Sequence, residues 1–320
     1  MASEHLVDPE LKPVLDFFPP LELSRETLPE LRGMLNQMRA AAAVGTDFPV
    51  SVDHITIPGP DHAPPLRVLS YRPTKAKGPL PAVLHIHGGG YVIGSADMMD
   101  AANRELAAEL DCAVVSVDYR LAPETPHPGP VEDCYAALKW LQGNAAELQV
   151  DAARIGVKGE SAGGGLAASL ALLARDRGEV PLAFQHLIYP MIDDRTGTGA
   201  SADQHRYVGE YVWTPAHSRF GWSCLLGTAP GGAGVSPYAA AARAVNLKGL
   251  PPTFISVGAL DLFLEEDLDY ARRLTRVGIP VELHVYPGAF HGFDMAPQTA
   301  RVAKAAARDS YDALRRALHG

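Results

Sequence analysis

A serine in a glycine-rich pentapeptide is the first residue whose setting suggests chemistry. Ser161 is the centre of Gly159-Glu160-Ser161-Ala162-Gly163, which has the form G-x-S-x-G. A short β-prone run at 154–158 precedes it, and an Ala- and Leu-rich run at 164–174 follows. A sharp strand-to-helix turn of this kind strains the serine backbone, exposes the hydroxyl and directs the next amide toward a developing oxyanion. A glycine-rich turn is also common as plain punctuation, so the motif needs partners before it indicates a nucleophile.

Two residues further along the chain have the types that a serine nucleophile requires. His291 follows the β-prone run 281–286 and is a candidate for the base that takes the serine proton. Asp261 follows the run 253–257 and is a candidate for the acid that orients the histidine. Each candidate lies just beyond the carboxyl end of a predicted strand, where open parallel sheets place their sites.

Three acids compete with Asp261 for the orienting role. Glu265, Glu266 and Asp267 begin the helix that is predicted to follow. Acidic side chains in a first turn complement the helix dipole, so we expect these three to be solvent-exposed. Asp261 is therefore the better candidate.

A run of glycines after the predicted strand 82–86 could stabilise negative charge. Gly88, Gly89 and Gly90 follow His87, and glycine allows bare backbone N–H groups to approach a carbonyl oxygen closely. This run, together with the amide of Ala162, is a candidate for an oxyanion hole. The alternative is an ordinary flexible turn.

Strand and helix signals predict how these residues are held. Runs typical of strands occur at 51–57, 66–71, 82–86, 113–117, 155–159, 184–189, 253–257 and 281–286. The first two predict a hairpin, and the later ones alternate with helical stretches. This pattern predicts the α/β class, with a mostly parallel sheet covered by helices on both faces.

The alternation stops between residues 194 and 250, where Gly, Pro, Ala and aromatic residues accumulate. A long structureless loop is improbable in a compact domain, so we expect an insertion, helical at about 215–226, over the carboxyl edge of the sheet. The helix-like N-terminal segment 1–48 is its expected partner in a cap. Residues 49–320 then form the catalytic domain.

Composition excludes several classes of function. The formal net charge of −9 disfavours a nucleic-acid binder, and 47% hydrophobic with 20% charged residues is typical of a globular enzyme. Three scattered cysteines favour a reducing compartment, and the acidic N-terminal residues lack the pattern of a signal peptide. No apolar run reaches the roughly 18 residues of a membrane span. We therefore expect a cytoplasmic protein without a membrane or nucleic-acid partner.

Four motifs together resemble a known family. In chain order they are His87-Gly88-Gly89-Gly90, Val117-Asp118-Tyr119-Arg120-Leu121-Ala122-Pro123-Glu124, Gly159-Glu160-Ser161-Ala162-Gly163-Gly164 and Phe290-His291-Gly292-Phe293. They resemble the hormone-sensitive-lipase-like branch of the α/β-hydrolases, mainly microbial carboxylesterases, over roughly residues 50–315. The resemblance implies an eight-stranded sheet with a helical cap, and a Ser, Asp, His triad in that chain order.

The resemblance also assigns roles to single residues. It implies Ser161 as nucleophile, His291 as general base and acid, and Asp261 as the orienting carboxylate. It further implies the amides of Gly89, Gly90 and Ala162 as the oxyanion hole, with His87 and Gly88 supporting the glycine loop and Glu160 lying close by. The family usually continues Pro-Leu-Arg-Asp-Glu after its acid, whereas Leu262-Phe263-Leu264-Glu265-Glu266 stands here. The contacts of the missing Arg and Asp are thus open.

Substrate and assembly are less legible in the sequence. We expect Tyr91, Tyr189 and Trp213 to line the substrate site, short to medium acyl esters as substrates, and no cofactor. His85 and His87 form an H-x-H pair, but no third ligand has suggestive spacing, so we expect no metal. Amide, carbamate or lactone hydrolysis, and a non-catalytic small-molecule receptor, stay open as alternatives. The last strand, 281–286, is an expected edge strand through which a homodimer could form.

Overall fold

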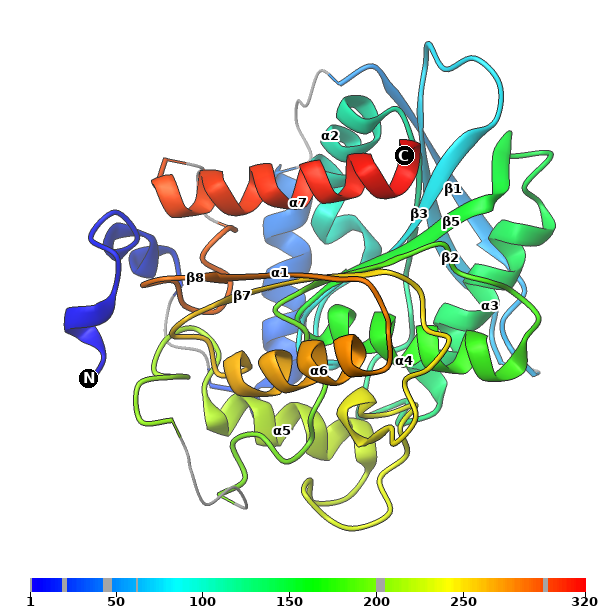
Figure 1. The fold of residues 1–320 in the computed structure, drawn as a ribbon. Helices are drawn as coiled ribbons and strands as arrows, with labels where there is room; N and C mark the ends of the chain where they lie inside the picture. Colours follow the sequence, from blue (N-terminus) through cyan, green and yellow to red (C-terminus); the bar gives the residue numbers. More distant parts are fainter. Residues whose placement is uncertain (1, 19–21, 43–47, 62, 200–204, 296–298) are drawn as a thin grey trace.

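An eight-stranded sheet runs through the computed structural model in the order β1-β2-β4-β3-β5-β6-β7-β8 (Figure 1). The structure describes residues 2–18, 22–42, 48–61, 63–199, 205–295 and 299–320. The strands are β1 Val50–Ile57, β2 Leu66–Pro73, β3 Leu80–Ile86, β4 Ala113–Val117, β5 Val150–Glu160, β6 Gln185–Ile188, β7 Thr253–Gly258 and β8 Val281–Tyr286. β1 and β2 form the predicted antiparallel hairpin, β2 pairs antiparallel with β4, and all other neighbours are parallel. The predicted mostly parallel sheet is confirmed.

Helices cover both faces of this sheet (Figure 1). They are α1 Leu28–Ala42, α2 Asp100–Leu110, α3 Gly129–Gly143, α4 Ala162–Arg177, α5 Pro215–Leu226, α6 Leu264–Arg276 and α7 Arg301–His319, with 3-10 turns at η1 Glu4–Leu6, η2 Lys12–Phe17, η3 Ala96–Met99 and η4 Ala241–Arg243. α2 and α7 lie on one face, and α3, α4 and α6 lie on the other. The last helix, α7, begins at Arg301, and residues 296–298 before it lie outside the described part of the chain.

Burial follows the position of each element in these layers. All residues of β3 and β7 are buried, as expected for strands covered on both faces. α4 is buried from Ala162 to Ala174, which its small and aliphatic residues permit on every side of the helix. β8 lies at the edge of the sheet and keeps Leu283 and Val285 exposed. These covered elements adjoin the candidate site, since β3 leads to the glycine loop, β7 leads to Asp261 and α4 follows Ser161.

The two segments expected to form a cap touch each other. Ser3 donates from its backbone N–H and its hydroxyl to the carboxylate of Glu210, in the insertion. Leu11 and Val14 are buried in one cluster with Tyr211 of the insertion and with Phe290. α5 has the bounds expected for the helix of the insertion. The N-terminal segment thus packs between the insertion and the loop of His291.

Candidate active site

The turn between β5 and α4 strains the backbone of Ser161 as the sequence predicts. Ser161 has φ of 56° and ψ of −121°, a region that costs a non-glycine residue free energy. The turn also needs close backbone approach, because a Cβ at Gly163 would collide with the carbonyl oxygen of Ile86. Only glycine fits there. The nucleophile elbow therefore forms from its local sequence and from the strand beside it.

The structure brings Ser161, His291 and Asp261 into one hydrogen-bonded chain. Nε2 of His291 lies 2.9 Å from Oγ of Ser161, and Nδ1 lies 2.8 Å from Oδ2 of Asp261. The other carboxylate oxygen of Asp261 accepts the backbone N–H of Phe263 at 3.0 Å. With Nδ1–H donating to Asp261, Nε2 is free to accept the serine proton. Asp261 is fully buried, so its charge acts on the imidazole with little screening by water.

Aromatic rings surround the imidazole of His291. The ring of Tyr189 lies 4.7 Å away and that of Phe263 lies 5.2 Å away, both edge-on, and the indole of Trp213 lies 6.2 Å away. His291 is 6% exposed. These contacts hold the ring plane and keep water from most of the imidazole.

The amides proposed for the oxyanion hole are available for a ligand. Within the described part of the chain, the backbone N–H groups of Gly89, Gly90 and Ala162 donate to no other described group. Ala162 opens α4, whose first N–H groups have no partner inside the helix and whose dipole favours negative charge there. The three donors therefore meet the chemical requirement for stabilising an oxyanion.

His87 contacts the glycine loop and is not the candidate base, which is His291. Its Nδ1 lies 2.8 Å from the carbonyl oxygen of Gly88, and its ring stacks on Tyr119 at 4.2 Å. Burial lowers the pKa of His87 to about 4, so the ring is neutral near pH 7. The hydroxyl of Tyr119 donates to the carbonyl oxygen of His87 at 2.9 Å. His87 and Tyr119 thus hold the glycine loop in place.

Glu160, whose role the sequence left open, belongs to a buried network beneath the serine. Its carboxylate pairs with Lys158 and lies 2.9 Å from Nε2 of His85. Nδ1 of His85 in turn contacts the hydroxyl of Ser116 at 3.0 Å and the amide of Asn103 at 3.2 Å. Burial alone would raise the pKa of Glu160, but Lys158 and His85 hold it well below its usual range. A charged residue next to the nucleophile is therefore locked to β3 and α2.

The expectation that Glu265, Glu266 and Asp267 form an exposed first turn is wrong for two of them. Glu265 is exposed, whereas Glu266 is 7% exposed and Asp267 is fully buried. Glu266 is covered because the chain that leaves β6 for the insertion crosses the start of α6. Burial raises the pKa of both carboxyls well above the usual range. The negative charge of Asp193 raises the pKa of Glu266 further, and the charges of Glu266 and Asp261 raise that of Asp267.

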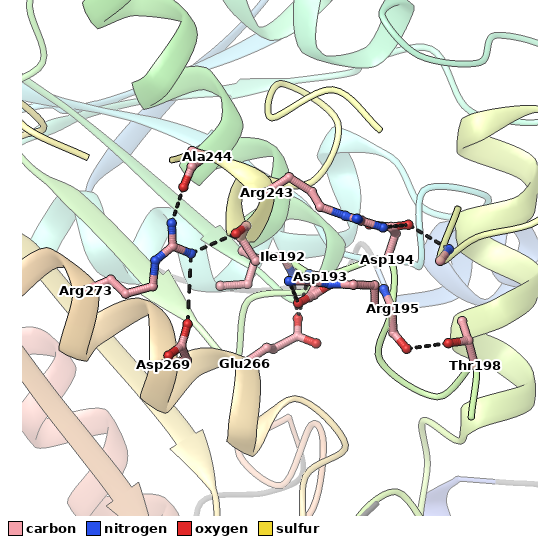
Figure 2. A network of polar contacts seen from close by, with 12 residues as sticks. Ile192, Asp193, Asp194, Arg195, Thr198, Arg243, Ala244, Glu266, Asp269 and Arg273 are labelled. Carbon is pink, nitrogen blue, oxygen red and sulfur yellow. Dashed lines mark hydrogen bonds and ion pairs between the residues drawn. The ribbon is translucent and has the colours of Figure 1, made fainter. Parts of the chain in front are cut away.

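Figure 2 shows what Glu266 does at this crossing. One of its oxygens accepts the backbone N–H groups of Ile192 and Asp193, at 2.6 and 3.0 Å. Next to it, Asp194 is paired with Arg243 at 2.7 Å, so the base of the insertion is held by two acids. Glu266 stands where the family motif has its Glu, whereas Leu264 and Glu265 stand where it has Arg and Asp. Sequence reasoning missed this role, although a glutamate at that motif position was a signal for it.

The three residues expected to line the substrate site differ in position. Trp213 lies against Gly90 and near His291, so it borders the predicted oxyanion hole. Tyr91 is fully buried, with its hydroxyl donating to the carbonyl oxygen of Met191 at 2.7 Å. Tyr189 is 2% exposed. Trp213 is itself 5% exposed, so burial does not separate the three, and their lining of the substrate site stays a prediction.

The described residues offer neither a metal site nor a membrane-spanning helix. Among the residues that the structure describes, no group of three His, Cys, Asp or Glu side chains could hold a metal ion. Across the same residues, every helix is too short or too polar to cross a bilayer. The three cysteines are buried and form no disulfide, and burial raises the pKa of Cys134, which makes it a poor nucleophile.

Comparison with known proteins agrees with this architecture. The sequence profile of a family described as the alpha/beta hydrolase fold matches residues 83–295. Carboxylesterase NlhH of Mycobacterium tuberculosis is 35% identical over 318 residues, which are 98% of this chain and 97% of that protein. Ethyl acetate hydrolase of Pseudomonas putida is 32% identical over 282 residues, 82% of each chain. The solved structure of a bacterial heroin esterase has a TM-score of 0.92 at 41% identity, over 99% of both chains.

A parallel sheet with a strained serine after β5, an acid after β7 and a histidine after β8 defines an α/β-hydrolase. The chain belongs to that family, in its hormone-sensitive-lipase-like branch of carboxylic ester hydrolases.

Proposed function

We propose that this protein is a serine carboxylesterase that hydrolyses short to medium acyl esters, acetyl esters among them, through an acyl-enzyme intermediate. The observation that carries the proposal is the 2.9 Å separation of Ser161 Oγ and His291 Nε2. The histidine is bonded in turn to the buried carboxylate of Asp261 at 2.8 Å.

In this reaction Ser161 attacks the ester carbonyl carbon while its proton passes to Nε2 of His291. The amides of Gly89, Gly90 and Ala162 stabilise the oxyanion of the tetrahedral intermediate. His291 then gives the proton to the leaving alcohol, and an acyl group stays on Ser161. Water, deprotonated by His291, releases the acid in a second round of the same steps.

The preference for short acyl groups is supported by the indole of Trp213. This ring packs against Gly90 and lies 6.2 Å from His291, so it takes up space directly beside the reacting centre. A relative of this chain is named for the hydrolysis of ethyl acetate, an ester with a two-carbon acyl group.

Ser161→Ala provides the direct test of this function. The variant is expected to keep its circular dichroism spectrum and to lose turnover of p-nitrophenyl acetate and labelling by a fluorophosphonate probe. Turnover near the wild-type rate would refute the role of Ser161. Labelled wild-type protein that turns over amides, carbamates or lactones but no open-chain esters would favour the alternative hydrolases. Unlabelled, inactive wild-type protein would favour a receptor.

Two expectations about assembly and location belong to the same proposal. We propose a homodimer through β8, supported by its edge position and by the exposed side chains of Leu283 and Val285. Light scattering on wild type and on Leu283→Lys tests it, with a monomeric variant expected. A cytoplasmic location stays a prediction.

A further inference from the structure

One short segment bonds both backbone groups of the candidate nucleophile. The N–H of Ser161 donates to the carbonyl oxygen of Ile188 at 2.9 Å, and the N–H of Met191 donates to the carbonyl oxygen of Ser161 at 2.9 Å. The segment 188–191, which begins with the last residue of β6, therefore fixes the backbone from which Oγ projects.

The same segment reaches the loop of the candidate base. The ring of Tyr189 lies 4.7 Å from the imidazole of His291. Its hydroxyl donates to Oδ1 of Asp294 at 2.7 Å, and Asp294 stands three residues after His291. Tyr189 thus links the loop of His291, through Asp294, to the segment 188–191 that holds Ser161.

The backbone of Tyr189 has little freedom. It has φ of 35°, in the left-handed region that a tyrosine rarely adopts, and its N–H donates to the carbonyl oxygen of Ser256 at 2.6 Å. Such strain persists only where the surrounding structure enforces it, and it gathers at functional sites. The direction of the tyrosine ring is therefore set by β6 and β7.

A cavity lies on the other side of this contact. Its volume is about 400 Å³, and Tyr189 and Asp294 line it together with residues of α2 and α7. Packing supports a side chain only where atoms touch it, so the cavity leaves the His291 loop room to shift on this side. The bond from the Tyr189 hydroxyl to Asp294 opposes such a shift.

We propose that Tyr189 and Asp294 are positioning residues that together set the distance between Ser161 and His291. The inference rests on the proposed function, since it concerns the proton transfer of that reaction. Without the hydroxyl bond the His291 loop relaxes toward the cavity, and Nε2 moves away from Oγ. Substrate binding should change little, because the ring of Tyr189 stays in place and only its bond to Asp294 is lost. The loss therefore falls on kcat, and misplacement by a fraction of an ångström costs about tenfold.

Four variants separate the hydrogen bond from other effects. Tyr189→Phe keeps the ring and removes the donor, while Asp294→Leu keeps the size and removes the acceptor. Asp294→Asn keeps an oxygen that can accept the same bond, so it is the rescue variant. Tyr238→Phe is the matched control, because Tyr238 donates to Asp176 at 2.9 Å in a similar Tyr–Asp pair remote from the site.

Kinetics with p-nitrophenyl acetate decide the matter. We expect Tyr189→Phe and Asp294→Leu each to lower kcat about tenfold with KM within twofold, and their double variant to lose no more than either alone. Asp294→Asn and Tyr238→Phe should keep kcat within about threefold, an allowance typical of a relocated neutral bond. The positioning role would be overturned by an unchanged kcat in Tyr189→Phe or by equal losses in Asp294→Asn and Asp294→Leu. It would also be overturned if the losses of Tyr189→Phe and Asp294→Leu added up in their double variant. An active Ser161→Ala would instead refute the proposed function itself.

Discussion

The indole of Trp213 occupies the space into which a side chain at Gly90 would point. Gly90 has φ of 58° and follows β3, whereas Trp213 comes from the insertion more than a hundred residues later. The insertion therefore supplies one wall of the predicted oxyanion hole, and the two parts of the fold meet at the reacting centre.

Gly90→Ala should lower kcat/KM for p-nitrophenyl acetate by about 10²–10³, the usual loss for one oxyanion donor. The added methyl would collide with Trp213 and displace the amide. Trp213→Ala in the same chain should restore part of the activity by making room. Gly78→Ala is the control, since Gly78 has φ of 80° but nothing within 4 Å of the added carbon. If Gly90→Ala and Gly78→Ala lost kcat/KM equally, backbone strain and not the collision with Trp213 would be responsible.

Trp213→Ala alone should move the acyl preference toward longer chains. Each further CH2 that the vacated space buries is worth about 0.8 kcal/mol, or about fourfold in kcat/KM. The ratio of octanoate to acetate hydrolysis should therefore rise at least tenfold, measured with p-nitrophenyl esters. Trp140→Ala, which changes a tryptophan in α3, should leave this ratio unchanged. A Trp213→Ala profile that matches wild type would remove Trp213 from the acyl site.

Glu160→Gln should destabilise the protein by about 3 kcal/mol at pH 7, because it leaves the ammonium of Lys158 without its buried partner. The folded pKa of Glu160 is depressed, so its stabilising effect is present above the unfolded value of about 4.3 and is lost as pH falls through the folded pKa. Urea unfolding of wild type and variant should accordingly differ less at pH 4 than at pH 7. A difference that does not change with pH would contradict the charge interaction.

Asp267→Asn should stabilise the protein, and increasingly so at higher pH. The folded pKa of Asp267 is raised by burial, and neither of its oxygens has a partner among the described residues. Above the unfolded value of about 3.9 only the unfolded chain loses this proton, which costs the fold about 1.4 kcal/mol per pH unit until the folded pKa is reached. Denaturation at pH 5, 6, 7 and 8 measures this slope. The exposed neighbour supplies the control, Glu265→Gln, for which no such trend is expected.

Much of the candidate site could be predicted because its geometry is local. Ser161, Asp261 and His291 each follow a strand whose β-prone residues mark it in the sequence, and parallel strands end at the same edge. Segment ends were harder to predict. β5 begins at Val150, five residues before the predicted start. The sequence does not indicate these first residues, because Asp151 and the two residues after it carry no strand pattern.

What could not be predicted depends on contacts between distant segments. Glu266 has the sequence setting of an exposed first turn, and only the amides of Ile192 and Asp193 explain its burial. Tyr189 and Asp294 are 105 residues apart, and no pattern in either neighbourhood indicates their bond. Tyr91 follows the glycine loop, as a residue that lines the site would, yet its hydroxyl donates to the backbone carbonyl oxygen of Met191. Periodicity reports which face of an element is covered, but not by what.

The packing of the N-terminal segment has a consequence for how the protein is made. Leu11 and Val14 find their apolar partner Phe290 only after most of the chain has been translated, and Glu10 pairs with Arg301 later still. At about 5–20 residues per second, these side chains spend tens of seconds on the ribosome without that partner. Residues 11 and 14 are thus made long before the neighbours that bury them, and the loop of His291 gains this cover only after it has itself been translated.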